Sequence, residues 1–328
     1  MLQNKDQKDD IKDDTSTEEL RRTYMNTISQ IDHVPMVKWY YYRDLMNDYD
    51  FARTGICPNR AFYKLWEILK KFPSMVPRRQ HPNTCHLAEA PGSFIKVAQI
   101  VLDHPNSVAI SKPRADGQHT PTFQKDLYKN RHVKLTYGNL LCEWDRTEFI
   151  KRFNNFDLVT ADGGIDEKCF QDKEPMHHQL LFAEAITALQ IQALNGNLVF
   201  KFFETFTETT LQILYFITQH YTNYTITKPL TSRPTNSERY LLCRGFKGLT
   251  TNKGLPATMN DLDHNISPNT RQFITRYNTN LIKNQIKAIQ DTLDIINGKT
   301  PIDKDARLRI KNEAYIAFCQ RFDLTNTV

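Results

Sequence analysis

The stretch HLAEAPGSF, residues 86–94, decides how this chain folds. Its pattern predicts the end of a buried strand, a turn at Pro91-Gly92 and a helix that starts near Ser93. In open α/β sheets, ligands bind where strands end and helices begin, because backbone N–H groups point outward there. A single Pro-Gly turn is also common where nothing binds, so this stretch alone indicates a fold and leaves the site open.

Strand-like and helix-like segments alternate around this stretch, which predicts an α/β fold with a mostly parallel sheet covered by helices. Apolar side chains at helical spacing predict a helix over residues 59–71, ended by Pro73. Seven short apolar segments are expected to be strands: Thr84–Ala88, Ser107–Ile110, His132–Thr136, Leu158–Ala161, Gly196–Phe203, Tyr224–Thr227 and Arg239–Arg244.

The N-terminal part of the chain is expected to lie outside the sheet. Residues 1–17 are highly charged and nearly free of apolar side chains, so we expect a disordered tail. Ser16 and Glu19 stand at capping-box spacing and predict a helix that runs towards Asp32. A second helix is expected over Met36–Asn47.

The C-terminal part is expected to be loop-rich over 250–269 and then to form two helices, one ending at Asn297 and one over 303–322. The first has an apolar stripe at spacings of four and three: Ile282, Ile286, Ile289, Leu293 and Ile296. We expect this stripe to be buried and the helices to pack on the main domain, with docking of a partner protein as the alternative. The chain thus divides into a tail at 1–17, an N-terminal helical extension at 18–58, an α/β domain at 59–248 and a helical C-terminal extension at 249–328.

Composition excludes several classes of protein. The net charge of +6 and the pI of 8.9 suit a polyanionic partner, but many proteins with this charge bind none. The six cysteines are scattered without metal-ligand spacing, so we expect reduced, buried thiols and no metal, and His177-His178 receives no metal role. No signal-like segment and no run of about 18 apolar residues occurs, so we expect neither secretion nor a membrane span, but a place in the cytoplasm or the nucleus.

Three further segments place polar side chains at predicted strand ends. In FDLVTADGG an apolar strand delivers Asp162 beside two glycines, and in KPLTSRPTNSERY a polar loop brings Glu238 to the start of a strand. In GNLVFKFFE, Lys201 interrupts an apolar strand, and a buried lysine needs a partner. Two acids and a lysine at one sheet edge indicate a proton-handling site, with a structural cluster of ion pairs as the alternative.

The order and wording of these segments resemble the FtsJ-like ribose 2′-O-methyltransferases from about residue 59 to 248. The helix NRAFYKLWEI is similar to the family's SRAxxKLxEI stretch. The resemblance implies a Lys-Asp-Lys-Glu catalytic tetrad at Lys64, Asp162, Lys201 and Glu238. It also implies a Rossmann-like class I methyltransferase sheet with an antiparallel last strand, S-adenosylmethionine as cofactor and RNA as substrate.

Within the family, HLxEAPGxF is most similar to the cap methyltransferases of eukaryotes and large DNA viruses. This likeness implies methylation of the first or second transcribed nucleotide of capped mRNA. The alternatives are ribose methylation of ribosomal or transfer RNA and a non-catalytic RNA-binding relative of the fold.

The resemblance also implies a cofactor site. Asn139 stands near the expected adenine position, where the family has an acidic residue, and no acidic counterpart follows the second strand near Ser111. An asparagine still accepts and donates hydrogen bonds. The residues implied to bind the cofactor are Glu89, Ala90, Pro91, Gly92, Ser93, Phe94, Asn139 and Asp162.

Methyl transfer to a ribose hydroxyl is an in-line displacement at a sulfonium, so the enzyme mainly aligns the oxygen and handles its proton. Lys201 is the expected proton acceptor. A neighbouring cation at Lys64 lowers the pKa of Lys201, whereas Asp162 and Glu238 raise it. The sequence leaves open which effect wins.

Other residues allow both a functional and a structural interpretation. The aromatic run Trp39–Tyr42 can stack on a base, but packing within a helix is the favoured interpretation. Ser237 is placed to touch the target ribose or to cap its loop. Four basic residues are expected either to contact RNA phosphates or to form a solvated basic face: Lys70, Lys71, Arg78 and Arg79.

Overall fold

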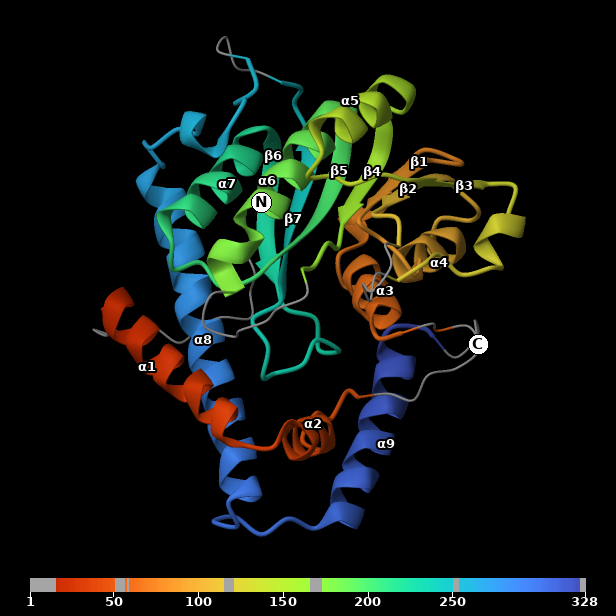
Figure 1. Cartoon of the computed structure of the whole chain (residues 1–328). Coiled ribbons are helices and arrows are strands. Elements are labelled where there is room, and N and C mark those ends of the chain that lie inside the picture. The colour runs from red at the N-terminus through yellow and green to blue at the C-terminus, as the bar shows by residue number, and fades with distance from the viewer. Residues whose placement is uncertain are drawn as a thin grey trace.

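A computed structural model describes residues 16–50, 57, 59–114, 121–165, 173–249 and 254–324. Within these residues, seven strands form one sheet in the order β3-β2-β1-β4-β5-β7-β6 (Figure 1). Every pair of neighbours is parallel except those made by β7, which runs antiparallel to β5 and β6. This is the predicted class I methyltransferase sheet. The strands are β1 (Asn83–Leu87), β2 (Asn106–Ser111), β3 (Val133–Tyr137), β4 (Phe156–Ala161), β5 (Gln192–Phe202), β6 (Tyr221–Thr227) and β7 (Arg239–Phe246).

The strand prediction is wrong mainly at the start of β5, which begins at Gln192 rather than Gly196. The Asn195-Gly196 dipeptide is typical of a turn, and Asn195 does adopt a left-handed φ of 62°. The chain nevertheless stays paired, because a register shift against β4 accommodates the extra residues.

Helices cover both faces of the sheet. Side chains of α5 (Glu143–Arg152), α6 (Lys173–Ile191) and α7 (Glu208–Gln219) pack on one face. The opposite face is covered by α3 (Ala61–Lys71), α4 (Ser93–Val101) and α9 (Lys304–Arg321). Along β5, Leu198 and Phe200 belong to the first core and Val199 to the second, so alternate side chains serve opposite faces. Lys201 therefore lies on the face of α3 and α4.

The N-terminal helices are α1 (Thr17–Ser29), which a 3₁₀ turn at Gln30–His33 continues, and α2 (Met36–Leu45). The Ser16 side chain accepts a hydrogen bond from the Glu19 N–H, which confirms the predicted helix start. Thr17 therefore lies in α1 and not in the expected tail. Residues 1–15 of that tail lie outside the described residues.

The long helix α8 (Pro268–Ile296) belongs to the C-terminal extension and packs against α1 and α2 of the N-terminal extension. Figure 1 shows α1 alongside α8 and α2 between α8 and α9. Three residues of the predicted stripe of α8 are buried, namely Ile282, Ile289 and Leu293, and Ile286 and Ile296 are partly buried. The stripe packs on the N-terminal helices and not on the sheet, against the cluster of Leu20, Tyr24, Ile28, Ile31 and Trp39. Near its start, α8 also packs on the sheet core, through the buried Ile274 and the partly buried Phe273 and Tyr277. The N-terminal helices and the later turns of α8 thus form one helical unit.

The last helix, α9, packs on the main domain through Phe318 and Phe322, and the Trp66 indole donates to the Phe322 carbonyl at 2.8 Å. Leu308 and Ile316 remain more than half exposed, and a partner protein on this helix stays a prediction. Among the described cysteines, Cys142 is exposed, contrary to the expected burial, because it stands at the N-cap of α5.

None of the helices in the described ranges is long and apolar enough to cross a membrane. The described part of the chain has no cluster of three or more His, Cys, Asp and Glu side chains placed to hold a metal. The His178 imidazole instead lies 3.0 Å from the Thr207 hydroxyl and 3.1 Å from that of Thr210.

Candidate active site

Four charged side chains meet at the carboxyl edge of the sheet. Asp162 directly follows β4, and Lys201 is the last residue but one of β5. Because β7 is antiparallel, its first residues lie at the same edge, which brings in Glu238. Lys64, in the first turns of α3, approaches from the helix that covers this face.

Two short contacts pair these charges. Lys201 Nζ donates to the Asp162 backbone oxygen at 2.7 Å and lies 3.2 Å from its carboxylate. Lys64 Nζ lies 2.6 Å from Glu238 Oε1. All four side chains are at most 14% exposed, so these pairs are shielded from solvent.

Tyr240 links the two pairs and is a residue that the sequence analysis missed. Its buried hydroxyl lies 2.9 Å from Asp162 Oδ1 and 3.1 Å from Glu238 Oε1, and it donates its one hydrogen to either carboxylate. The signal was present, since residues two apart on a strand share a face. Tyr240 also pairs in register with Lys201.

The neighbouring carboxylates decide the direction of the Lys201 pKa shift, which the sequence left open. Burial opposes the charged amine, but Asp162, Glu238 and Glu184 outweigh it and raise the pKa of Lys201 above its ordinary value. Burial likewise opposes the charge of Glu238, yet Lys64 and Lys201 hold the pKa of Glu238 well below its usual range. The resting site therefore contains an ammonium at Lys201 and a carboxylate at Glu238.

A second missed acid, Glu184, lies on α6 behind the Asp162 turn. Its carboxylate accepts from the Gly163 N–H at 3.0 Å, and a Cβ at Gly163 would lie 2.4 Å from the same oxygen. Burial raises the pKa of Glu184 to about 8, although Lys201 works to lower it. This contact explains why a glycine follows Asp162.

The loop after β1 has the features of a ligand site. Gly92 has a left-handed φ of 108°, and a Cβ there would lie 2.2 Å from Leu127 Cδ1. Glu89 Oε1 accepts from the Phe94 N–H at 2.6 Å, while Oε2 is buried without a hydrogen-bond partner among the described residues. The glycine is required by its backbone conformation and by the Leu127 side chain, whereas the open buried oxygen of Glu89, just after β1, fits a ligand that donates hydrogen bonds.

Other residues implied to bind the cofactor have internal partners. The Ser93 hydroxyl donates to Asn59 Oδ1 at 2.7 Å, and the Phe94 ring is fully buried in the core under α3 and α4. Asn139 Oδ1 accepts from the Leu141 N–H at 3.1 Å. The side-chain oxygen of Asn139 thus closes the turn into α5. A role of these residues in cofactor binding stays a prediction.

An acidic residue that the sequence analysis missed stands beside Asn139. Asp145 Oδ2 accepts from the Asn139 N–H at 2.7 Å, and a Cβ at Gly138 would lie 3.5 Å from the Asp145 Cβ. Asp145 therefore fixes this turn.

The four basic residues expected to contact RNA lie in the last turn of α3 and in the loop between α3 and β1. Lys70 pairs with Asp323 at 3.3 Å, and the Lys71 amine lies over the Phe72 ring. Arg79 lies 3.8 Å from Asp157, near the amino end of β4 and hence at the sheet edge opposite the tetrad. RNA contacts by Lys70, Lys71, Arg78 and Arg79 stay a prediction.

The aromatic run on α2 is divided between core and surface. Trp39 is only 2% exposed and packs in the helical unit, in line with the favoured interpretation. Tyr40 and Tyr41 are about half exposed. Ser237 lies buried beside Glu238, and its carbonyl accepts from Arg239 Nε at 2.9 Å.

The chain matches the FtsJ-like methyltransferase family over residues 57–246, more than half of its length. It therefore belongs to the FtsJ-like methyltransferases, a family that uses S-adenosylmethionine as methyl donor.

Its relatives include enzymes named for the mRNA cap. The chain is 38% identical over 196 residues to a cap-specific mRNA (nucleoside-2′-O-)-methyltransferase of Autographa californica nuclear polyhedrosis virus, covering 56% of this chain and 71% of the relative. It is 38% identical over 116 residues to cap-specific mRNA (nucleoside-2′-O-)-methyltransferase 1 of Dictyostelium discoideum, covering 33% and 15%. It is 30% identical over 213 residues to the corresponding methyltransferase 2 of Drosophila melanogaster, covering 57% and 29%. The chain thus spans less than a third of the two cellular relatives.

Proposed function

We propose that this chain transfers a methyl group from S-adenosylmethionine to a ribose 2′-hydroxyl at the first or second transcribed nucleotide of capped mRNA. The observation that carries the proposal is the convergence of Lys64, Asp162, Lys201 and Glu238 on one sheet edge, beside the Gly92 loop. Charged side chains that are buried together and perturb one another's pKa are typical of catalytic sites.

The residues fit a donor bound along the carboxyl ends of β1 and β4. Glu89 Oε2 and the backbone around Gly92 would hold it, with Asp162 at the end nearest Lys201. When bound, S-adenosylmethionine supplies an electrophilic methyl group on a positively charged sulfur.

Lys201 is the proposed proton acceptor for the ribose hydroxyl. Its pKa is raised in the free chain, so it must release its own proton before it accepts another. A further positive charge at this edge lowers the pKa of a lysine and favours that release. The Asp162 backbone oxygen and carboxylate accept from the amine, so the lone pair of the neutral amine is directed away from them.

Glu238 and Lys64 are proposed to orient the ribose. The Lys64 pair keeps Glu238 ionised, and an ionised carboxylate accepts hydrogen bonds from ribose hydroxyls. Tyr240 holds the carboxylates of Asp162 and Glu238 in fixed relation.

The cap as target is supported by the three relatives named for cap-specific methylation, two of them cellular and one viral. Ribose methylation of ribosomal or transfer RNA uses the same chemistry and is the competing outcome. The test is incubation with labelled S-adenosylmethionine and RNAs that differ only in the 5′ cap, followed by mapping of the labelled nucleotide. We expect label at the first or second nucleotide of capped RNA alone. Equal labelling of uncapped RNA, or label at internal sites, would remove the cap assignment.

A further inference from the structure

The loop that carries Glu238 is tied together by one partly buried amine. Lys228 Nζ donates to the Asn236 carbonyl at 2.7 Å, to the Asn236 side chain at 2.9 Å and to the Glu238 carbonyl at 3.0 Å. These contacts fix the shape of the loop between β6 and β7. Contacts from outside the loop also hold it: Glu67 of α3 accepts from the Leu230 N–H at 3.0 Å, and Asp44 of α2 accepts from Arg233 Nε at 3.0 Å. The part of the loop next to Glu238 is held by α8.

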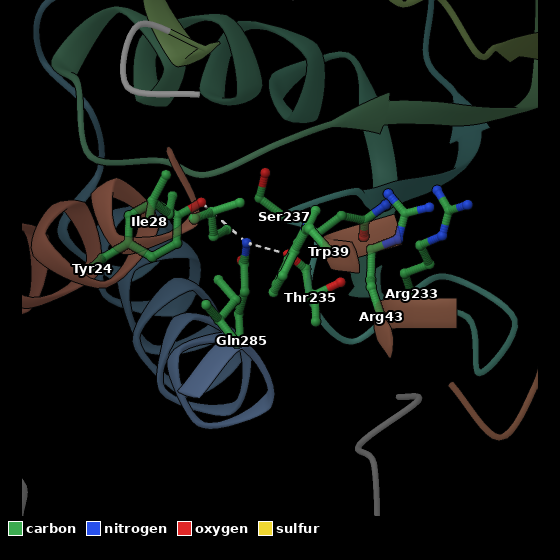
Figure 2. Close-up of a pocket in the computed structure, with 11 residues that line it drawn as sticks. Tyr24, Ile28, Trp39, Arg43, Arg233, Thr235, Ser237 and Gln285 are labelled. Atoms are coloured by element: carbon green, nitrogen blue, oxygen red, sulfur yellow. Dashed lines mark hydrogen bonds between the residues drawn. The ribbon is translucent and has the colours of Figure 1, made fainter. Parts of the chain in front are cut away.

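One contact with α8 is made by Gln285. Its Nε2 donates to the Thr235 carbonyl at 3.1 Å and to the Tyr24 hydroxyl oxygen of α1, also at 3.1 Å (Figure 2). Gln285 is only 4% exposed, in the middle of the apolar stripe. A single amide therefore connects both terminal extensions to the catalytic loop.

The second contact with α8 is made by Asn278, two turns earlier on the same face of the helix. Its Oδ1 accepts from the buried Arg239 guanidinium at 2.8 Å and from the Thr205 N–H at 3.2 Å. Arg239 in turn donates from Nε to the Ser237 carbonyl. The residues on both sides of Glu238 are thus held by α8.

The side chains behind residues 235–237 are not tightly packed, so packing alone does not hold this part of the loop. A cavity of about 70 Å³ lies behind the loop, lined on one side by Thr235, Asn236 and Ser237 and on the other by helical residues that include Trp39 and Ile289. Figure 2 shows Gln285 reaching across from α8 to Thr235 in this region. The loop has room to move if the polar contacts are lost.

We propose that α8 is a positioning element of the active site, in which Asn278 and Gln285 hold residues 235–239 so that Glu238 meets Lys64 and faces Lys201. This inference rests on the proposed function for its catalytic consequence. It assigns the C-terminal extension a part in turnover, through residues that touch neither RNA nor cofactor.

The variants Gln285→Ala and Asn278→Ala remove the two contacts. We expect kcat for RNA methylation to fall about tenfold or more with KM for S-adenosylmethionine within about twofold, since small misplacements of catalytic groups are costly. Asn278→Asp keeps the oxygen that accepts from Arg239 and should retain kcat within about threefold of the wild type. The controls are Gln290→Ala, whose amide donates to Asp294 of the same helix at 3.0 Å, and Asn284→Ala at an exposed position of α8.

The pH dependence separates positioning from loss of stability. Charged groups face Lys201 from each neighbouring element: Glu89 after β1, Asp162 after β4, Glu184 on α6, and Glu238 before β7 with Lys64 of α3 beyond it. Displacing Glu238 removes one contribution that raises the pKa of Lys201. The limb of the kcat profile that rises with pH should therefore move to lower pH in Gln285→Ala and stay in place in Gln290→Ala.

Amide hydrogen exchange of the peptide 229–238 gives a readout that needs no activity. We expect faster exchange in Gln285→Ala than in the wild type and no change in Gln290→Ala. Wild-type kcat, pH profile and exchange in both Gln285→Ala and a folded Asn278→Ala would overturn the inference. If the wild type itself transfers no methyl group to any RNA, the proposed function fails, whereas the exchange comparison still decides whether α8 positions the loop.

Discussion

The ammonium of Lys64 lies 2.6 Å from the carboxylate of Glu238, so an ion pair joins the start of α3 to the start of β7. Both side chains are largely buried, and a buried charge without its partner is costly. The contact that helps to hold α3 on the sheet thus also fixes a carboxylate of the proposed active site.

Replacing Lys64 by methionine should lower both stability and turnover. Glu238 is left without its nearest cation, so we expect the free energy of unfolding to fall by about 3 to 5 kcal/mol. Denaturant titration measures this change. The double variant Lys64→Met/Glu238→Gln should regain most of the stability but no turnover. A single variant as stable as the wild type would show that the pair is unimportant.

Lys201→Ala should abolish methyl transfer and leave the affinity for S-adenosylmethionine within a few-fold of the wild type, because the amine is proposed to act on the ribose hydroxyl and not on the donor. Calorimetric titration gives the affinity, and incorporation of labelled methyl gives the turnover. Near-normal turnover would remove the role assigned to Lys201.

Tyr240→Phe tests the bridge between the two carboxylates. The ring remains to fill the core, so the fold should persist, but Asp162 and Glu238 lose a shared donor that contributes about 1 kcal/mol. We expect kcat to fall about tenfold at an unchanged KM for S-adenosylmethionine. Wild-type kcat would restrict Tyr240 to packing.

Glu67 on α3 provides a test of stability against pH. Burial raises its pKa to about 7, while the Leu230 N–H, which it accepts at 3.0 Å, works to lower it. A carboxyl whose pKa is raised on folding contributes fully below its unfolded pKa and loses that contribution as the pH rises through about 7.

The neutral variant Glu67→Gln should therefore gain stability relative to the wild type between pH 5 and pH 8, by up to about 3 kcal/mol. Melting temperatures of the two chains at each pH supply the comparison. A constant difference across this range would contradict the raised pKa.

The sequence predicted the sheet and the meeting of Asp162 and Lys201 at one edge because both depend on local pattern, whereas Lys64 was placed only by the family resemblance. Asp162 and Lys201 each stand in or directly after an apolar strand, and strand ends of an α/β sheet meet at one edge. Glu238 joins them because β7 is antiparallel, which the family resemblance implied and spacing alone did not.

The residues that the sequence analysis missed depend on long-range packing. Gln285 and Asn278 lie among apolar residues of α8. From the sequence, a polar side chain there is assigned to the exposed face of the helix, and only the structure shows the groups it contacts. The same reason explains the partner of the α8 stripe. A periodic apolar stripe predicts burial, but it does not say that the N-terminal helices, rather than the sheet, will cover it.

The most direct test of the central claim is the chemical identity of the methylated product. The chain is incubated with S-adenosylmethionine and capped RNA, the RNA is digested to nucleosides, and the nucleosides are identified by mass spectrometry, with Lys201→Ala as the control. The account predicts a 2′-O-methyl nucleoside formed by the wild type and absent with the variant. A methyl group on a base, or a 2′-O-methyl nucleoside formed equally by both chains, would contradict it.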